Sequence, residues 1–165
     1  MAEAPRGVKE SGLYCGFAMR YLGLDVGDRN VGVARSDESG TLATGLATLR
    51  RVGPRKDVKA VVELVRQHEA GEVVVGLPRC LDGSLGPQAQ KVLAFMKDLR
   101  GALRVAVVPW DERFSTVIAN QVLIEGDVSR KDRRAMVDKV SAILILQNYL
   151  DYKKLASAEA QKTSA

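Results

Sequence analysis

The sequence has few of the residues that carry several common chemistries. It holds two cysteines, Cys15 and Cys80, which are too few for a disulfide framework and lack the clustering of a zinc site. Its single histidine, His68, stands far along the chain from the notable acidic residues, so Ser-His-Asp or Cys-His catalysis is not expected. No stretch reaches the roughly 18 to 20 apolar residues of a membrane span. These absences favour a protein of a reducing compartment, the cytoplasm, with no membrane partner.

What is present fits one compact domain with an acidic partner. The 165 residues are 46% hydrophobic, enough for a single domain with its own core. Lysine and arginine number 25 against 20 aspartates and glutamates, and the net charge of +5 favours a partner such as nucleic acid. Residues 1–18 predict a flexible N-terminal extension, with Met19 as an alternative start. Residues 154–165 predict a disordered C-terminal tail, which leaves residues 19–153 as the domain.

Short apolar runs and helical spacings alternate along this domain. Three strands come first and helices then alternate with strands, which indicates an α/β sheet with an antiparallel hairpin at its edge and parallel central strands. The last helix is apolar on nearly every side at its centre, so we expect it to pack against the sheet. The predicted strands are 21–25, 31–35, 41–49, 72–77 and 104–109. The four predicted helices are, in chain order, 57–70, a helix from after Ser84 to 101, a third from Ser115 or Thr116 to 126, and 132–153.

Acidic residues interrupt this pattern at three places. Asp25 ends the first strand, Asp111 and Glu112 follow the last strand, and Asp138 precedes the apolar centre of the last helix. Each place has a structural alternative, namely a turn cap, a helix N-terminus and a salt bridge, respectively. Taken together, carboxylates from a first strand, a later parallel strand and a C-terminal helix can meet at one edge of the sheet. Such a group would bind Mg²⁺, and two ions there would activate water for attack on a phosphodiester.

A family likeness is carried by four strings in order: LGLDVGDRNVGVA at 22–34, VVGLPRCLDGSLGPQA at 74–89, WDERFST at 110–116 and VDKVSAILILQNYLD at 137–151. The chain resembles the YqgF-type Holliday junction resolvases, also described as nucleases for the 5′ end of pre-16S ribosomal RNA, within the RNase H-like superfamily. The resemblance implies an RNase H-like α/β fold with a five-stranded mixed sheet. It also implies a metal site in which Asp25, Glu112 and Asp138 are the catalytic residues and metal ligands. Asp111 is either a further ligand or a neighbour that positions Glu112.

The same region predicts contacts to substrate phosphates. A guanidinium and backbone N–H groups at the start of the third predicted helix would hold one phosphate. Two basic stretches, 50–59 and 130–139, could contact phosphates, and the second is preferred for this role because it lies beside Asp138. For both stretches the alternative is a helix face that is charged only because it faces solvent. The predicted substrate-binding residues are Arg113, Ser115, Thr116, Arg130, Arg133 and Arg134.

Two positions depart from the family pattern. Trp110 replaces a residue that is often polar, and its indole either stacks on a nucleobase or closes the core, which is the more common role. Cys80 stands in the loop after the fourth strand, where the family commonly has a polar residue.

The leading interpretation is a Mg²⁺- or Mn²⁺-dependent nuclease that uses water as the nucleophile on structured RNA. The resemblance implies that it matures the 5′ end of small-subunit ribosomal RNA. One alternative is a resolvase of four-way DNA junctions, which would need a symmetric homodimer to cut two strands. The other is a nucleic-acid-binding module that does not cut, which the presence of all three acids disfavours.

Overall fold

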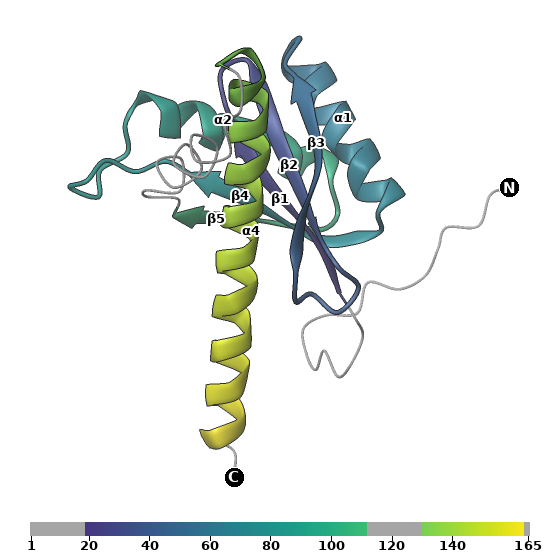
Figure 1. Ribbon diagram of the computed structural model, residues 1–165, viewed down its shortest axis with the longest axis vertical. Helices are drawn as coiled ribbons and strands as arrows, with labels where there is room; N and C mark the ends of the chain where they lie inside the picture. Colours follow the sequence, from purple (N-terminus) through teal and green to yellow (C-terminus); the bar gives the residue numbers. More distant parts are fainter. Residues whose placement is uncertain (1–18, 112–129, 164–165) are drawn as a thin grey trace, which may run out of the picture.

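The computed structural model describes residues 19–111 and 130–163. Within these ranges a five-stranded sheet has the order β3-β2-β1-β4-β5 (Figure 1). β1 pairs antiparallel with β2, and β2 with β3, whereas β4 runs parallel to both β1 and β5. The predicted mixed sheet with its hairpin strands at one side is therefore confirmed. The strands are β1 (Arg20–Val26), β2 (Asn30–Ser36), β3 (Ala43–Arg50), β4 (Ala70–Leu77) and β5 (Ala106–Asp111).

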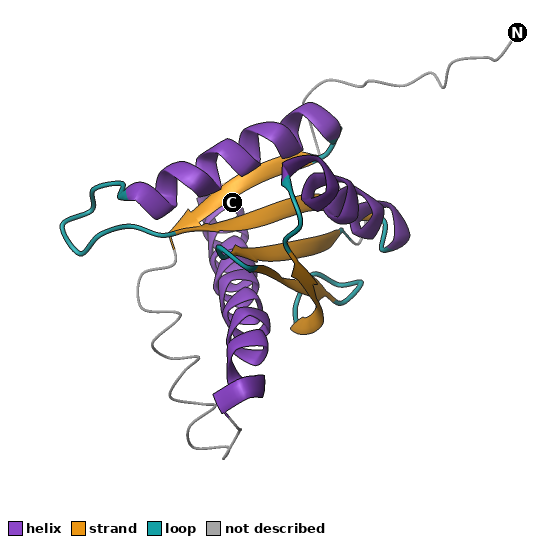
Figure 2. Ribbon diagram, turned by 90° about the horizontal axis from the view of Figure 1, so that it is seen from above, coloured by secondary structure: helices purple, strands orange, loops and turns teal. Residues whose placement is uncertain are grey.

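Helices cover both faces of the sheet. Helices α1 (Pro54–Gln67) and α2 (Pro87–Ala102) lie on one face, and α4 (Arg130–Thr163) crosses the other (Figure 2). Successive strand residues point to opposite faces, so each strand supplies both cores. The core under α1 and α2 includes Leu22, Leu24, Val33, Val73 and Val75, and the core under α4 includes Ala34, Val74, Ala142, Ile145 and Leu146.

Glycines let α4 lie unusually close to β1 and β2. A Cβ atom at Gly32 would lie 1.9 Å from the carbonyl oxygen of Asp138, and one at Gly23 would lie 2.7 Å from Cβ of Leu146. Both distances are far shorter than a normal contact, so only glycine fits. Since Gly32 is the register partner of Asp25, this close approach brings Asp138 to the end of β1.

Two helix ends differ from the predicted ones. α1 ends at Gln67 rather than near Gly71, because Glu69 adopts a φ of 51° and reverses the chain before β4 begins at Ala70. The predicted disordered tail from residue 154 is wrong up to Thr163, because α4 continues through a segment rich in alanine, lysine, glutamate and glutamine, which favour helix. This part of α4 extends past the sheet (Figure 1). Residues 1–18 and the helix predicted from Ser115 or Thr116 lie outside the described residues.

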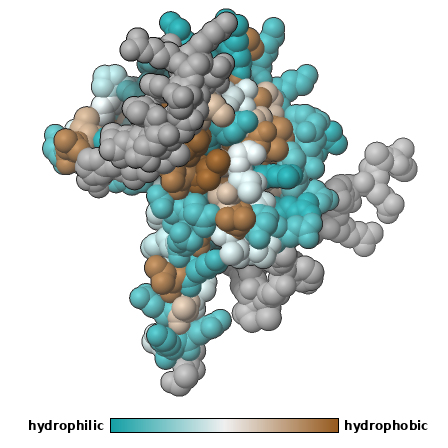
Figure 3. Space-filling model, viewed as in Figure 1, coloured by the Kyte–Doolittle hydropathy of each residue, from teal (hydrophilic) through white to brown (hydrophobic). Residues whose placement is uncertain are grey.

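The extended part of α4 has a mainly hydrophilic surface with isolated apolar side chains (Figure 3). Tyr152 is 56% exposed and Leu155 is 69% exposed. Just before them, α4 is tied to the sheet, because the Tyr149 hydroxyl donates a hydrogen bond to the buried Glu72 carboxylate and Lys153 Nζ lies 3.2 Å from the same group. Lys153 is thus the last described residue of α4 that bonds to the sheet.

Candidate functional site

The strands and helices bring two of the predicted acids to one end of the sheet. β1 carries Asp25 toward α4, and α4 places Asp138 over the neighbouring Gly32 of β2. Asn30, the first residue of β2, donates a hydrogen bond from Nδ2 to the Asp138 carboxylate at 3.2 Å. A cavity of about 280 Å³ opens beside this carboxylate and is lined by Gly27, Asp28, Arg29, Asn30 and Asp138. We call this end of the molecule the acidic end.

Burial and repulsion disfavour the charged form of Asp25. Removal from water is the larger cause and the charge of Asp138 is the second, and together they raise the pKa of Asp25 from 3.8 to about 7. Ser141 of α4, which is fully buried, faces Asp25, and its hydroxyl partly lowers this pKa. Two carboxylates that repel each other in a partly buried site favour an added proton or a bound cation.

Asp111 does not join this pair. It is the last residue of β5 and is in register with Leu77, whose side chain belongs to the core under α1 and α2. By strand alternation Asp111 therefore lies on the face opposite to Asp25. Its carboxylate is 4.0 Å from Nε of Arg79. Glu112, the other member of the adjacent pair, lies outside the described residues.

The predicted substrate contacts are described only in part. Arg130, Arg133 and Arg134 belong to the first turns of α4, on the N-terminal side of Asp138, and only their backbone is described. Arg113, Ser115 and Thr116 lie in the part of the chain that is not described.

Trp110 packs into the protein. Its ring centroid lies 5.4 Å from that of Tyr149 and 5.3 Å from that of Tyr152, and it packs against the core under α4. This contact supports the core alternative for Trp110 over stacking on a nucleobase.

Residues to which the sequence assigned no role at the metal site hold the turn after Asp25. The carbonyl of Val26 accepts a hydrogen bond from Nε2 of Gln88 at 3.1 Å, and the carbonyl of Gly27 accepts one from Nη1 of Arg51 at 3.0 Å. Lys91 Nζ forms an ion pair with Asp28 at 2.8 Å. The partners come from positions 24 to 63 residues further along the chain, so no local pattern could have identified them.

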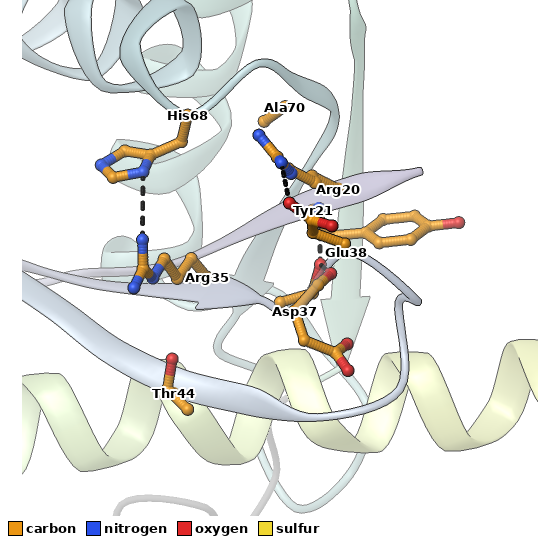
Figure 4. Close-up of a pocket in the computed structure, with 9 residues that line it drawn as sticks. Arg20, Tyr21, Arg35, Asp37, Glu38, Thr44, His68 and Ala70 are labelled. Atoms are coloured by element: carbon orange, nitrogen blue, oxygen red, sulfur yellow. Dashed lines mark hydrogen bonds and ion pairs between the residues drawn. The ribbon is translucent and has the colours of Figure 1, made fainter. Parts of the chain in front are cut away.

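A larger cavity, of about 410 Å³, lies at the opposite end of the sheet (Figure 4). Its basic groups are already engaged by protein atoms. Arg20 pairs with both Glu38 and Glu69, and Nη1 of Arg35 lies 3.4 Å from Nδ1 of His68. The acids that line it, Asp37 and Glu38, are exposed and bonded to Ser39 and Arg20, whereas Asp25 and Asp138 are partly buried and repel each other. The acidic end is therefore the better candidate.

The donor set at the acidic end suits a hard divalent cation. Carboxylate oxygens of Asp25 and Asp138 and the side-chain oxygen of Asn30 are the ligand type that Mg²⁺ prefers. Within the described residues no three acidic, histidine or cysteine side chains form a complete metal cluster. The third predicted ligand, Glu112, belongs to the part that is not described. No described helix is long and apolar enough to cross a membrane.

Comparison with known proteins gives a consistent result. A sequence profile of the family RuvX, described as Holliday junction resolvase, matches residues 19–152. A protein of Thermoanaerobacter pseudethanolicus named "Putative pre-16S rRNA nuclease" is 49% identical over 137 residues, and the match covers 82% of this chain and 99% of that protein. A protein of the same name from Caldanaerobacter subterraneus subsp. tengcongensis is 52% identical with the same coverage.

A solved structure supports the fold alone. T. thermophilus RuvC in complex with a Holliday junction substrate is similar with a TM-score of 0.55 and 15% identity, over 84% of this chain and 96% of that chain.

Proposed function

Since the chain belongs to the RuvX family of Holliday junction resolvases, we propose that it is a divalent-metal-dependent endonuclease that processes the 5′ end of pre-16S rRNA in the cytoplasm. The family and the names of the similar proteins agree on a phosphodiester-cleaving hydrolase. The observation that carries the proposal is the meeting of Asp25 from β1 with Asp138 from α4. Two half-buried carboxylates of this kind are costly unless a cation compensates them.

Asp25, Asp138 and Glu112 would hold Mg²⁺ or Mn²⁺. When bound there, such ions supply an activated water and stabilise the leaving oxygen of the phosphodiester. The chain's own residues prepare the site: Asn30 orients the Asp138 carboxylate, and Arg51 and Gln88 fix the backbone that follows Asp25. The proposed substrate contacts are Arg113, Ser115, Thr116, Arg130, Arg133 and Arg134.

The test is cleavage of a precursor ribosomal RNA that carries its 5′ leader, with Mg²⁺ or Mn²⁺ and with chelator. The wild type is compared with Asp25→Asn, and Asp98→Asn serves as a matched control because Asp98 is exposed on α2, near the helix end remote from Asp25. We expect metal-dependent cleavage by the wild type and by Asp98→Asn. We expect Asp25→Asn to lose at least about 10²-fold in rate, in line with the loss of one transition-state contact. Cleavage that persists in chelator would contradict the proposal.

A second candidate is the resolution of four-way DNA junctions, which the description of the family favours. The metal chemistry would be the same, but two symmetric cuts need a homodimer. A four-way junction in a parallel reaction, together with sedimentation of the protein alone, separates the two candidates. Symmetric junction cutting by a dimer with no RNA cutting would favour the resolvase. Binding of both substrates without cutting would favour the non-catalytic module.

A further inference from the structure

Four exposed cations lie together at the acidic end without acidic partners. Arg29 belongs to the turn between β1 and β2, and Arg50 is the last residue of β3. Arg55 and Lys56 lie in the first turn of α1. None of the four is within 4 Å of a carboxylate of the described residues. We call these four residues the basic strip.

Several other cations of the described chain pair with acids. Arg20, Arg66, Lys91 and Lys153 each pair with a carboxylate at 3.2 Å or less. A solvated helix face normally interleaves acids with bases, as Arg66 and Glu63 do on the far part of α1. The lack of such acids in the basic strip leaves its charge available to an anionic partner.

The basic strip is continuous with the candidate site. Arg29 lines the 280 Å³ cavity together with Asp138. Arg50 is the register partner of Asn30, which bonds to Asp138. Arg50 and Lys56 both line a second, smaller cavity of about 90 Å³. The basic strip therefore extends from the candidate site, past the end of β3, to the start of α1.

Nearby acids do not neutralise the positive charge of the basic strip. Lys91 pairs with Asp28 and holds the pKa of that carboxyl below its usual value. Asp57 is buried, and although burial opposes its charge, hydrogen bonds from the Val52 N–H and from Arg51 keep its pKa low. Both acids are therefore already compensated by their own partners.

The ion pair between Arg51 and Asp57 helps to fix the backbone that carries the basic strip. Nε of Arg51 lies 3.0 Å from the Asp57 carboxylate, Nη1 of Arg51 bonds to the Gly27 carbonyl, and the Arg51 N–H bonds to the Arg29 carbonyl at 2.8 Å. Arg51 thereby links the turn that carries Arg29 to the segment between Arg50 and α1. The backbone that carries the strip is therefore fixed before binding, which lowers the entropic cost of contacting phosphates.

We propose that the basic strip binds the phosphate backbone of the RNA segment that flanks the cleaved bond. The proposal rests on the proposed function, since it takes the RNA substrate from it, but it concerns a surface outside the metal site. The first basic stretch of the sequence would thus have a role in addition to that assigned to Arg130, Arg133 and Arg134.

The test measures RNA binding as a function of salt. Arg50→Gln with Lys56→Gln removes two charges from the strip, and Lys97→Gln with Arg104→Gln removes two exposed charges from the opposite end, so net charge is matched. All variants carry Asp25→Asn, which is expected to slow cleavage by at least about 10²-fold. We expect the strip variant to bind the RNA about tenfold more weakly and to lower the slope of log affinity against log salt by about 1.4 to 1.8, the value for two phosphate contacts. The control pair should change neither by more than about twofold.

Shortening the RNA flank gives a second, independent readout. Removal of the flank should weaken binding by the protein with the intact strip and by the control pair, but not by the strip variant. Equal binding by strip and control variants, or equal sensitivity to flank length, would overturn the proposal. Cleavage of the same RNA by the wild type tests the proposed function separately. If the wild type binds and cuts only the four-way junction, the proposed function fails. Junction binding by the variants then tests the basic strip, and an equal loss of junction binding in the strip variant and the control pair would overturn its phosphate-binding role.

Discussion

The carboxyl group of Asp25 makes the stability of the folded chain depend on pH. Its pKa is 3.8 in the unfolded chain and about 7 in the folded one, so the folded state keeps a proton that the unfolded state has lost. The contribution of Asp25 to stability therefore falls as pH rises from about 4 to above 7. In the absence of metal we expect Asp25→Asn to be more stable than the wild type at pH 8 by up to about 4 kcal/mol, with little difference at pH 4.

Urea unfolding in the presence of chelator, at several pH values, measures this difference. Asp98→Asn is the control, because an exposed carboxylate should leave the pH profile of the wild type unchanged. Parallel pH profiles for the wild type and Asp25→Asn would contradict the raised pKa of this carboxyl.

Gly32 controls how closely α4 can approach β2. A Cβ atom there would overlap the Asp138 carbonyl, which is backbone and cannot swing away. We expect Gly32→Ala to lower the free energy of unfolding by about 3 kcal/mol and to displace Asp138, with a loss of cleavage. Gly101→Ala is the matched control, because nothing lies within 4 Å of its Cβ position and alanine favours helix by up to about 1 kcal/mol. Equal stability of the two variants in urea unfolding would show that α4 does not depend on this contact.

At the scale of elements, the strands and helices could largely be predicted, whereas some of their ends could not. The apolar run in Glu72–Leu77 identifies a strand covered on both faces, and β4 indeed extends over it. The end of α1 was missed because Glu69 adopts a positive φ, a role that the pattern assigns to the nearby Gly71. The length of α4 was missed because an apolar face is not needed where helix propensity alone continues a helix.

The same distinction holds for the candidate site. Asp25 and Asp138 could be singled out because each is an acid where the pattern calls for an apolar residue. The side of the sheet on which Asp111 lies depends on how far β5 continues, and this was known only from the register with Leu77. Asn30 and Arg51 act through hydrogen bonds to residues that are distant in sequence, so their roles required the structure.

The part of α4 beyond the sheet should be dispensable for folding. All described residues from 156 to 163 are exposed, whereas Tyr149 and Leu150 are buried against the sheet. We expect deletion of residues 156–165 to change the melting temperature by no more than about 2 °C. Deletion from residue 148 onward removes the bond between Tyr149 and Glu72 and should abolish cooperative unfolding. A large loss of stability in the shorter deletion would show that the extended part has a contact of its own.

At the scale of the whole molecule, the carboxylate pair and the basic strip lie at the same end of the sheet. At the acidic end, two carboxylates repel each other and exposed cations remain without acidic partners. This combination favours a divalent cation at the carboxylates and a polyanion beside it, which are the two components that cleavage of a nucleic acid requires.

A divalent cation should therefore stabilise the entire fold through the acidic end. A ligand that binds only the folded state adds RT ln(1 + [L]/Kd), or about 1.4 kcal/mol when Mg²⁺ exceeds its Kd tenfold, which corresponds to a rise of about 4 °C in melting temperature. The rise should be larger at pH 8 than at pH 5, because Mg²⁺ competes with the proton that Asp25 holds at low pH. Asp25→Asn and Asp138→Asn should lose the response, Asp98→Asn should keep it, and chelator should reverse it. If both acidic-end variants respond to Mg²⁺ as the wild type does, the cation binds elsewhere and the carboxylate pair is not its site.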